Sequence, residues 1–165
     1  MNDFAFPQLV ELVRRVHSHY HKLLIIAGPS ESGKTCLLKQ IAAQFQLPSI
    51  NLSLFLSQRL LSQTRRQRSL NAEDVAIEVI DEHMKSGLCL DDTELLFDST
   101  LRLNPLVFLQ EITRNRLIVA TWNGVVTGGE LRFGHTGHPD YFSQTVTGYP
   151  VVSLAEDKLQ LHLTT

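Results

Sequence analysis

Several classes of protein are excluded by what this sequence lacks. Two cysteines in 165 residues are too few for the disulfide framework on which small secreted domains depend. No apolar run approaches the roughly 18 residues of a membrane-spanning helix, and no N-terminal segment has the pattern of a signal peptide. The formal net charge of −2 provides no overall attraction to nucleic acid or to an anionic membrane. We therefore expect a soluble cytoplasmic protein without a membrane partner, in which any contact with DNA depends on a local patch.

The composition is that of a folded domain. Hydrophobic residues make up 43% of the chain and charged residues 19%, values typical of globular proteins. A chain of 165 residues can bury a substantial core without disulfides or structural metals. We expect one domain over residues 1–165.

The most informative segment is residues 28–35, which read GPSESGKT. They satisfy the P-loop pattern, in which two glycines flank four residues and Lys and Ser or Thr follow. An apolar run at 22–27 suits a buried strand, and residues 36–43 have apolar side chains at helical spacing. Such a loop directs backbone N–H groups and a helix start at phosphates. The expected phosphate-binding residues are Gly28, Pro29, Ser30, Glu31, Ser32, Gly33, Lys34, Thr35 and Cys36.

The P-loop also predicts a metal site. Lys34 is expected to reach the β- and γ-phosphates, and the Thr35 hydroxyl to bind Mg²⁺, which prefers oxygen ligands. Asp91 follows the apolar run at 88–90, and a carboxylate at the end of a neighbouring strand would complete the Mg²⁺ shell. No Asn-Lys-x-Asp motif for guanine is present in the chain. The expected cofactors are ATP and Mg²⁺.

Polar residues that follow two of the strands are candidates for positioning the attacking water. Asp92 is the first candidate base, although many ATPases have Glu at this place, and Glu94 is the second. Asn123, or alternatively Thr121, follows the next strand, where AAA+ ATPases commonly have a polar residue near the γ-phosphate. An ordinary Asn-Gly turn explains Asn123 equally well.

Two groups of arginines have competing interpretations. Arg114 and Arg116 follow a helix and could contact the γ-phosphate of a neighbouring subunit, which requires a homo-oligomer. They could instead simply complement the dipole of that helix. The densest positive cluster, which could contact DNA or form a solvated loop, consists of Arg59, Arg65, Arg66 and Arg68.

Strands alternating with helices predict an α/β fold with a mostly parallel sheet covered on both faces. We expect a three-layer α/β/α P-loop NTPase with five strands, AAA+-like, without a C-terminal helical lid. Its parts are an N-terminal helix within 1–21 that includes Tyr20, a nucleotide-binding core at 22–123, and a hairpin and final strand at 124–165. Other expected elements are strands at 49–52, 88–91, 117–121 and 151–154, helices at 53–61 and 104–115, a basic loop at 64–69, a helix capped by Asn71 and closed by Gly87, and a hairpin at 125–133.

Several later motifs occur in order with the P-loop. They are LDDTELLFD at 90–98, NPLVFLQ at 104–110, TRNR at 113–116, WNG at 122–124, and, in addition, NLSL at 51–54, SQRLL at 57–61 and GHPDY at 137–141. With these motifs the chain resembles the BrxF family, the small P-loop proteins of type 3 BREX phage-defence systems. The resemblance implies a bacterial AAA+-like ATPase that works with other BREX proteins, which methylate host DNA and block phage replication.

Overall fold

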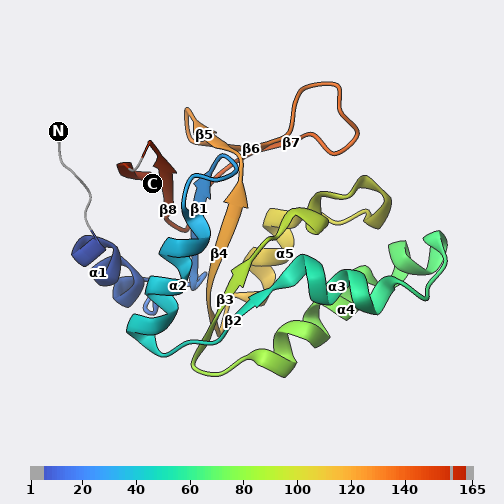
Figure 1. Cartoon of the computed structure of the whole chain (residues 1–165), viewed down its shortest axis with the longest axis horizontal. Coiled ribbons are helices and arrows are strands. Elements are labelled where there is room, and N and C mark those ends of the chain that lie inside the picture. The colour runs from blue at the N-terminus through green and yellow to red at the C-terminus, as the bar shows by residue number, and fades with distance from the viewer. Residues whose placement is uncertain (1–5, 157, 163–165) are drawn as a thin grey trace.

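A mostly parallel six-stranded sheet organises the chain, with strand order β2-β3-β4-β1-β8-β9 (Figure 1). The computed structural model describes residues 6–156 and 158–162, and within them the chain forms five α-helices and two short 3-10 helices. The strands of this sheet are β1 (Leu23–Gly28), β2 (Ser49–Asn51), β3 (Gly87–Asp91), β4 (Leu117–Asn123), β8 (Val151–Ala155) and β9 (Lys158–His162). The helices are α1 (Phe6–Val16), α2 (Lys34–Phe45), α3 (Leu52–Leu60), α4 (Arg65–His83), η1 (Glu94–Phe97), η2 (Ser99–Leu101) and α5 (Pro105–Ile112).

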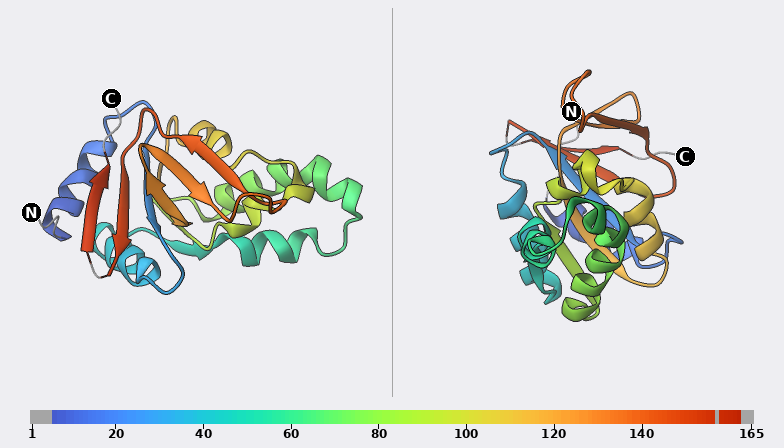
Figure 2. Two further views of the ribbon diagram at one scale, coloured as in Figure 1. Left: turned by 90° about the horizontal axis from the view of Figure 1, so that it is seen from above. Right: turned by 90° about the vertical axis from the view of Figure 1, so that its right-hand side faces the viewer.

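Helices cover both faces of the sheet, as the sequence predicts (Figure 2). Alternate residues of a strand point to opposite faces, and in β1 Leu23 and Ile25 belong to one apolar cluster while Leu24 and Ile26 belong to the other. The first cluster includes buried residues of α3, α4 and α5, and the second includes those of α1 and α2. The α/β class with three layers is therefore confirmed.

The expected number of strands was too small by one. Five strands are parallel, and β9 pairs antiparallel with β8 at the edge of the sheet. The turn before β9 contains Glu156 with φ 49°, a left-handed conformation usually occupied by glycine. Because Glu156 stands where a glycine is usual, the hairpin lacks the strongest local turn signal.

Three of the expected helices have other boundaries than predicted. The first helix ends at Val16, and Tyr20 lies beyond it with 69% of its surface exposed; residues 1–5 of the predicted segment lie outside the described residues. Thr64 caps α4 through a capping box with Gln67, so the arginines of the expected basic loop belong to the first turns of a helix. Asn71 is inside α4 and caps nothing, and Gly87 begins β3. The helix after Asn104 is confirmed but ends at Ile112.

A second, antiparallel sheet lies beyond the carboxyl ends of β1 and β4 (Figure 1). Its first two strands, β5 (Val125–Thr127) and β6 (Glu130–Phe133), form the hairpin predicted around Gly128 and Gly129, and β7 (Phe142–Thr145) pairs with β6. Aromatic rings fix this sheet to the core: the Phe97 ring stacks on Phe133 at 4.1 Å between centroids and meets Trp122 edge-on at 4.5 Å.

Gly124 allows the close approach of the two sheets. A Cβ atom at this position would lie 1.9 Å from the Arg132 carbonyl oxygen. We predict that Gly124→Ala lowers the free energy of unfolding by about 1–3 kcal/mol, the usual cost of overpacking, in urea denaturation. The neighbouring Val125→Ala is the control, because that side chain is 51% exposed. A Gly124→Ala protein as stable as the control would contradict the tight packing described here.

No helix within the described residues has the length and apolar character to cross a membrane.

Candidate nucleotide site

The P-loop lies at the edge of the sheet where the parallel strands β1, β3 and β4 end. Gly28 pairs in register with Asn123, and Leu90 with Ala120, so the ends of these three strands are neighbours. Gly33 has φ 95°, a conformation that L-residues rarely adopt. A Cβ atom on Gly28 would lie 2.5 Å from the Leu154 carbonyl oxygen. Both glycines of the motif are thus required by the backbone path around the anion position.

Lys34 is held inside the loop. Its Nζ donates to the Pro29 carbonyl oxygen at 2.5 Å and to Asn123 Oδ1 at 3.3 Å, and the residue is only 9% exposed. Burial lowers the pKa of the Lys34 ammonium, while the carboxylates of Asp91 and Glu94 act in the opposite direction. The Pro29 carbonyl oxygen that Lys34 contacts carries only a partial negative charge. A bound phosphate would offer the ammonium a full negative charge in its place.

Asp91 and Thr35, the two expected Mg²⁺ ligands, lie side by side. Asp91 Oδ1 accepts hydrogen bonds from Thr35 Oγ1 at 3.2 Å, from Thr121 Oγ1 at 3.1 Å and from the Asp92 N–H at 2.9 Å. The described residues contain no group of three or more His, Cys, Asp and Glu residues that could enclose a metal ion. Thr35 Oγ1 and Asp91 Oδ1 are oxygen atoms of the kind that Mg²⁺ prefers, and they fit an ion that would take its remaining ligands from phosphate and water. Thr121 is 4% exposed and positions Asp91, so it is not the polar residue beside the P-loop.

Asn123 connects the P-loop to Glu94. Its Nδ2 donates to Glu94 Oε1 at 2.6 Å and to Ser30 Oγ at 3.1 Å, while its Oδ1 accepts from Lys34. Asn123 is the last residue of β4, and the N–H of Gly124 donates to the Gly28 carbonyl. The Asn-Gly pair is therefore attached to the P-loop strand and does not form an isolated tight turn.

The two candidate bases, Asp92 and Glu94, have different surroundings. Asp92 adopts φ 47°, and its carbonyl accepts from the Ser53 N–H at 2.9 Å and from Ser53 Oγ at 2.7 Å. These contacts fix the chain turn after β3, and Thr93 anchors the next residue by donating to the Thr121 carbonyl at 2.7 Å. The turn brings Glu94, the second candidate, to Asn123. Within the described part of the chain, the Asp92 carboxylate has no hydrogen bond to the P-loop or to Asn123.

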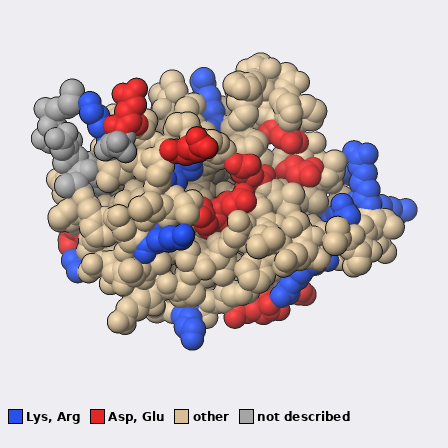
Figure 3. Space-filling view, in the orientation of Figure 1, with Lys and Arg blue, Asp and Glu red and all other residues tan. Residues whose placement is uncertain are grey.

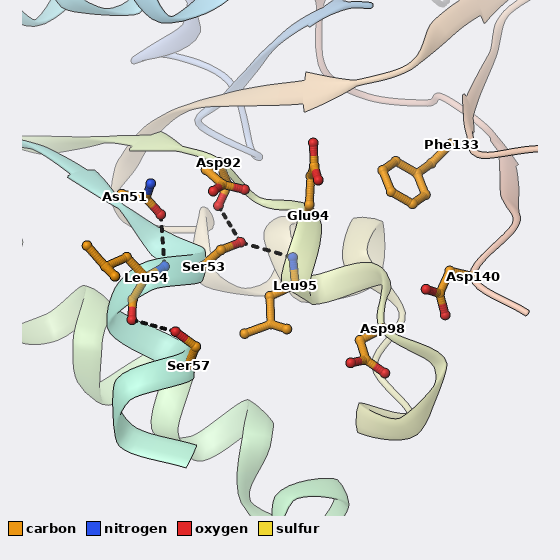
Figure 4. A pocket seen from close by; sticks show the side chains of 10 residues that line it. All are labelled: Asn51, Ser53, Leu54, Ser57, Asp92, Glu94, Leu95, Asp98, Phe133 and Asp140. Carbon is orange, nitrogen blue, oxygen red and sulfur yellow. Dashed lines mark hydrogen bonds between the residues drawn. The ribbon is translucent and has the colours of Figure 1, made fainter. Parts of the chain in front are cut away.

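A cavity of about 530 Å³ opens beside Glu94 (Figure 4). Acidic residues surround a hollow in the middle of the face shown in Figure 3. None of the four carboxylates that line the cavity has a salt-bridge partner among the described residues. The lining residues are Asn51, Ser53, Leu54, Ser57, Asp92, Glu94, Leu95, Asp98, Phe133 and Asp140.

A second cavity, of about 420 Å³, adjoins the P-loop under the antiparallel sheet. Pro29, Ser30 and Asn123 contribute to its lining together with Arg132 and Tyr141. The sequence pattern did not identify Arg132 as a residue near the P-loop, because only the folding of β6 over β4 brings it there. Its guanidinium forms a salt bridge with Glu130 at 3.0 Å.

Arg114 and Arg116 are far from the P-loop of their own chain. They precede β4, whereas Asn123 is at the other end of that strand. Arg116 forms a salt bridge with Asp81, and the Arg114 guanidinium lies 6.0 Å from the centre of the Tyr20 ring. Neither extends α5, which ends at Ile112. Neither arginine is therefore placed to contact a phosphate bound to the P-loop of its own chain.

The two cysteines differ in accessibility. Cys36 at the start of α2 is exposed, whereas burial raises the pKa of the Cys89 thiol to about 12. We predict that a thiol reagent modifies one group per native chain at pH 8 and two after unfolding, because the thiolate is the reactive form. The Cys36→Ser protein should show no rapid reaction. Two rapidly reacting thiols in the native wild type would contradict the buried position of β3.

Comparison with known proteins finds no matching family model and no matching curated protein. Among solved structures, one of PCH-2 from C. elegans is similar, with a TM-score of 0.41 and 20% identity over 73% of this chain. The match covers 36% of the PCH-2 chain.

Proposed function

We propose that this chain is a Mg²⁺-dependent, AAA+-like ATPase. The observation that carries the proposal is the hydrogen-bonded path from Lys34 through Asn123 to Glu94, next to the Thr35–Asp91 pair. It combines a phosphate-binding cation, a metal-binding pair and a carboxylate in one place. Position and electrostatics supply most of the catalysis in phosphoryl transfer.

Each residue has a distinct part in this proposal. The P-loop N–H groups and Lys34 bind the β- and γ-phosphates, and bound Mg²⁺ would neutralise charge developing on them. Asn123 orients the Glu94 carboxylate through the 2.6 Å hydrogen bond. Glu94 accepts a proton from the attacking water, whose oxygen bonds to the γ-phosphorus as the bond to the leaving ADP oxygen breaks.

We also propose the finer assignment to a BREX component that acts with other defence proteins. The motifs at 90–98, 104–110, 113–116 and 122–124, which follow the P-loop in the order of the BrxF family, support this assignment. The position of β4 between β1 and β3 supports only the broader AAA+-like proposal. In this proposal the chain forms a homo-oligomer, and Arg114 or Arg116 stabilises the γ-phosphate of an adjacent subunit.

Phosphate release from ATP tests the enzymatic proposal. We expect Mg²⁺-dependent release that increases more than proportionally with protein concentration, because an arginine from another subunit requires assembly. The Lys34→Ala protein is the control for contaminating ATPases. ATP binding without release at any concentration, alone or with DNA and partner proteins, would instead favour a nucleotide-dependent binding module.

The acidic cavity beside Glu94 favours a second candidate, phosphoryl transfer to a small acceptor. Hydroxyls and carboxylates line this space next to the expected γ-phosphate position. Arg65 and Arg68 are part of α4 and line neither P-loop cavity, so they do not form a lid over this space. ATP consumption that begins only when an acceptor is added would distinguish a kinase from a hydrolase.

A further inference from the structure

The basic cluster of α3 and α4 divides into two kinds of arginine. Arg59 forms a salt bridge with Glu82. Arg68 donates from Nε to the carbonyls of Leu60 at 2.9 Å and Gln63 at 3.0 Å, so it satisfies the end of α3. Arg65 and Arg66 have no salt bridge within the described residues. Two arginines of the cluster are therefore structural, and two are available for a ligand.

Folding adds a third available arginine. Arg102, at the end of η2, lines one cavity with Arg65 and Arg66, although more than 30 residues separate them in the sequence. Arg102 adopts φ 56°, which bends the chain and ends η2 beside α4. It too lacks a salt bridge among the described residues. Figure 3 shows basic side chains at the end of the molecule where α3 and α4 meet in Figure 1.

The lining of this arginine cavity suits phosphate groups. It measures about 710 Å³ and contains the three arginines with the hydroxyls of Ser69, Ser99 and Thr100, and Leu70. No carboxylate is among these lining residues. Guanidinium groups bind phosphate oxygens through paired hydrogen bonds. The hydroxyls add less, because Ser69 already donates to the Arg66 carbonyl and Thr100 to Asp98 Oδ1. Three unneutralised cations at one cavity therefore indicate an anion with more than one phosphate.

We propose that the arginine cavity binds the phosphate backbone of a nucleic acid duplex. The cavity is on an exposed end of the chain, separate from both P-loop cavities, and Leu70 beside it is 70% exposed. None of its lining residues is aromatic, so it offers no platform for stacking unpaired bases. It also lacks the aromatic anchors that usually dominate a protein interface. Backbone contacts of this type carry no direct sequence information, so we expect binding without strong sequence preference.

One continuous segment, residues 94–102, joins the arginine cavity to the nucleotide site. It begins with Glu94, which is bonded to Asn123, and ends with Arg102. Between them, Asp98 lines the acidic cavity, and its Oδ1 accepts from the N–H of Thr100 at 2.8 Å and from Thr100 Oγ1 at 2.6 Å. A duplex that contacts Arg102 therefore acts on the segment that positions Glu94. We expect DNA to change the rate of ATP hydrolysis; this expectation, unlike binding itself, rests on the proposed ATPase function.

Fluorescence anisotropy with a labelled 20-base-pair DNA duplex tests binding without ATP. For the Arg65→Gln, Arg66→Gln, Arg102→Gln triple variant we expect at least a tenfold weaker affinity. The slope of log K against log salt concentration should decrease in magnitude by about 3, roughly 1 for each lost phosphate contact. The matched control replaces three exposed cations outside the cavity, Arg14, Arg15 and Lys39, by Gln, and it changes the net charge equally. We expect the control to bind like the wild type, and thermal unfolding to confirm that both variants fold.

Three results would overturn the proposal. They are equal affinities of the triple variant and its control, no binding by the wild type at low salt, and displacement of the duplex by an acidic peptide at the same charge concentration. The last result would assign the cavity to an acidic protein. If the duplex binds as expected but no ATP is hydrolysed, the proposal that the arginine cavity binds DNA is supported and the ATPase proposal fails.

Discussion

Replacing Lys34 by alanine should raise the Kd for Mg²⁺·ATP by about 100-fold or more, a loss of roughly 2.7 kcal/mol. The Lys34 ammonium is enclosed by the loop that surrounds the phosphate position, and charge-assisted hydrogen bonds to phosphate are stronger than neutral ones. Isothermal titration calorimetry measures the change directly. The fold should survive, because burial of this charge carries a desolvation cost that alanine does not have.

Lys39→Ala is the matched control, since Lys39 is on the same helix but exposed. Its Kd should stay within about twofold of the wild-type value, since exposed charges contribute little. If Lys34→Ala binds Mg²⁺·ATP as tightly as this control does, the loop is not the nucleotide site.

Glu94→Gln should lower kcat for ATP hydrolysis by about 100- to 1,000-fold and leave the Kd for ATP nearly unchanged. General-base catalysis contributes effects of this order, and glutamine preserves the side-chain size but cannot accept the proton. Asp92→Asn should reduce kcat less than about threefold, because the backbone carbonyl of Asp92, not its carboxylate, makes the contacts with Ser53. Rapid-quench kinetics and a parallel binding titration separate the two quantities.

The reverse result, with Asp92→Asn inactive and Glu94→Gln active, would identify Asp92 as the base and remove Glu94 from the mechanism. Equal and small effects of both substitutions would favour the nucleotide-dependent binding module. Asn123→Ala provides an independent check. It should lower kcat as well, because it removes the hydrogen bond that orients Glu94.

The P-loop was predictable because its chemistry is contained in consecutive residues. Two glycines, Lys34 and Thr35 must occur at fixed spacing, and the adjoining strand and helix have their own hydrophobic periodicity. Asp91 could be placed by the same reasoning, since carboxyl ends of neighbouring parallel strands meet at one edge. The structure brings it to Thr35 as expected.

The different placement of Asp92 and Glu94 was not predictable from the sequence pattern. It depends on a left-handed turn at a residue other than glycine and on hydrogen bonds from Ser53 and Thr93 to distant backbone atoms. The strand β9 was missed for a related reason, because the left-handed residue of the preceding turn is Glu156 and not a glycine. Propensity describes local preference, and tertiary contacts decide these cases.

The arginines illustrate the same limit at longer range. Sequence proximity grouped Arg59 and Arg68 with Arg65 and Arg66, but the first two are used in helix contacts. Arg102 completes the cavity only because η2 packs beside the first turns of α4. The sequence cluster therefore predicted a positively charged region, and the fold determined which of its arginines line the same cavity.

The most direct test of the central claim is a single-turnover measurement with enzyme in excess over labelled ATP. This design avoids dependence on product release, which often limits kcat. The wild-type protein with Mg²⁺ should convert the bound ATP to ADP and phosphate, while EDTA and the Glu94→Gln substitution should each suppress the conversion. Recovery of unchanged ATP from the wild-type complex, with binding shown to be complete and at a protein concentration where oligomers form, would contradict the assignment of an ATPase site to Lys34, Glu94 and Asn123.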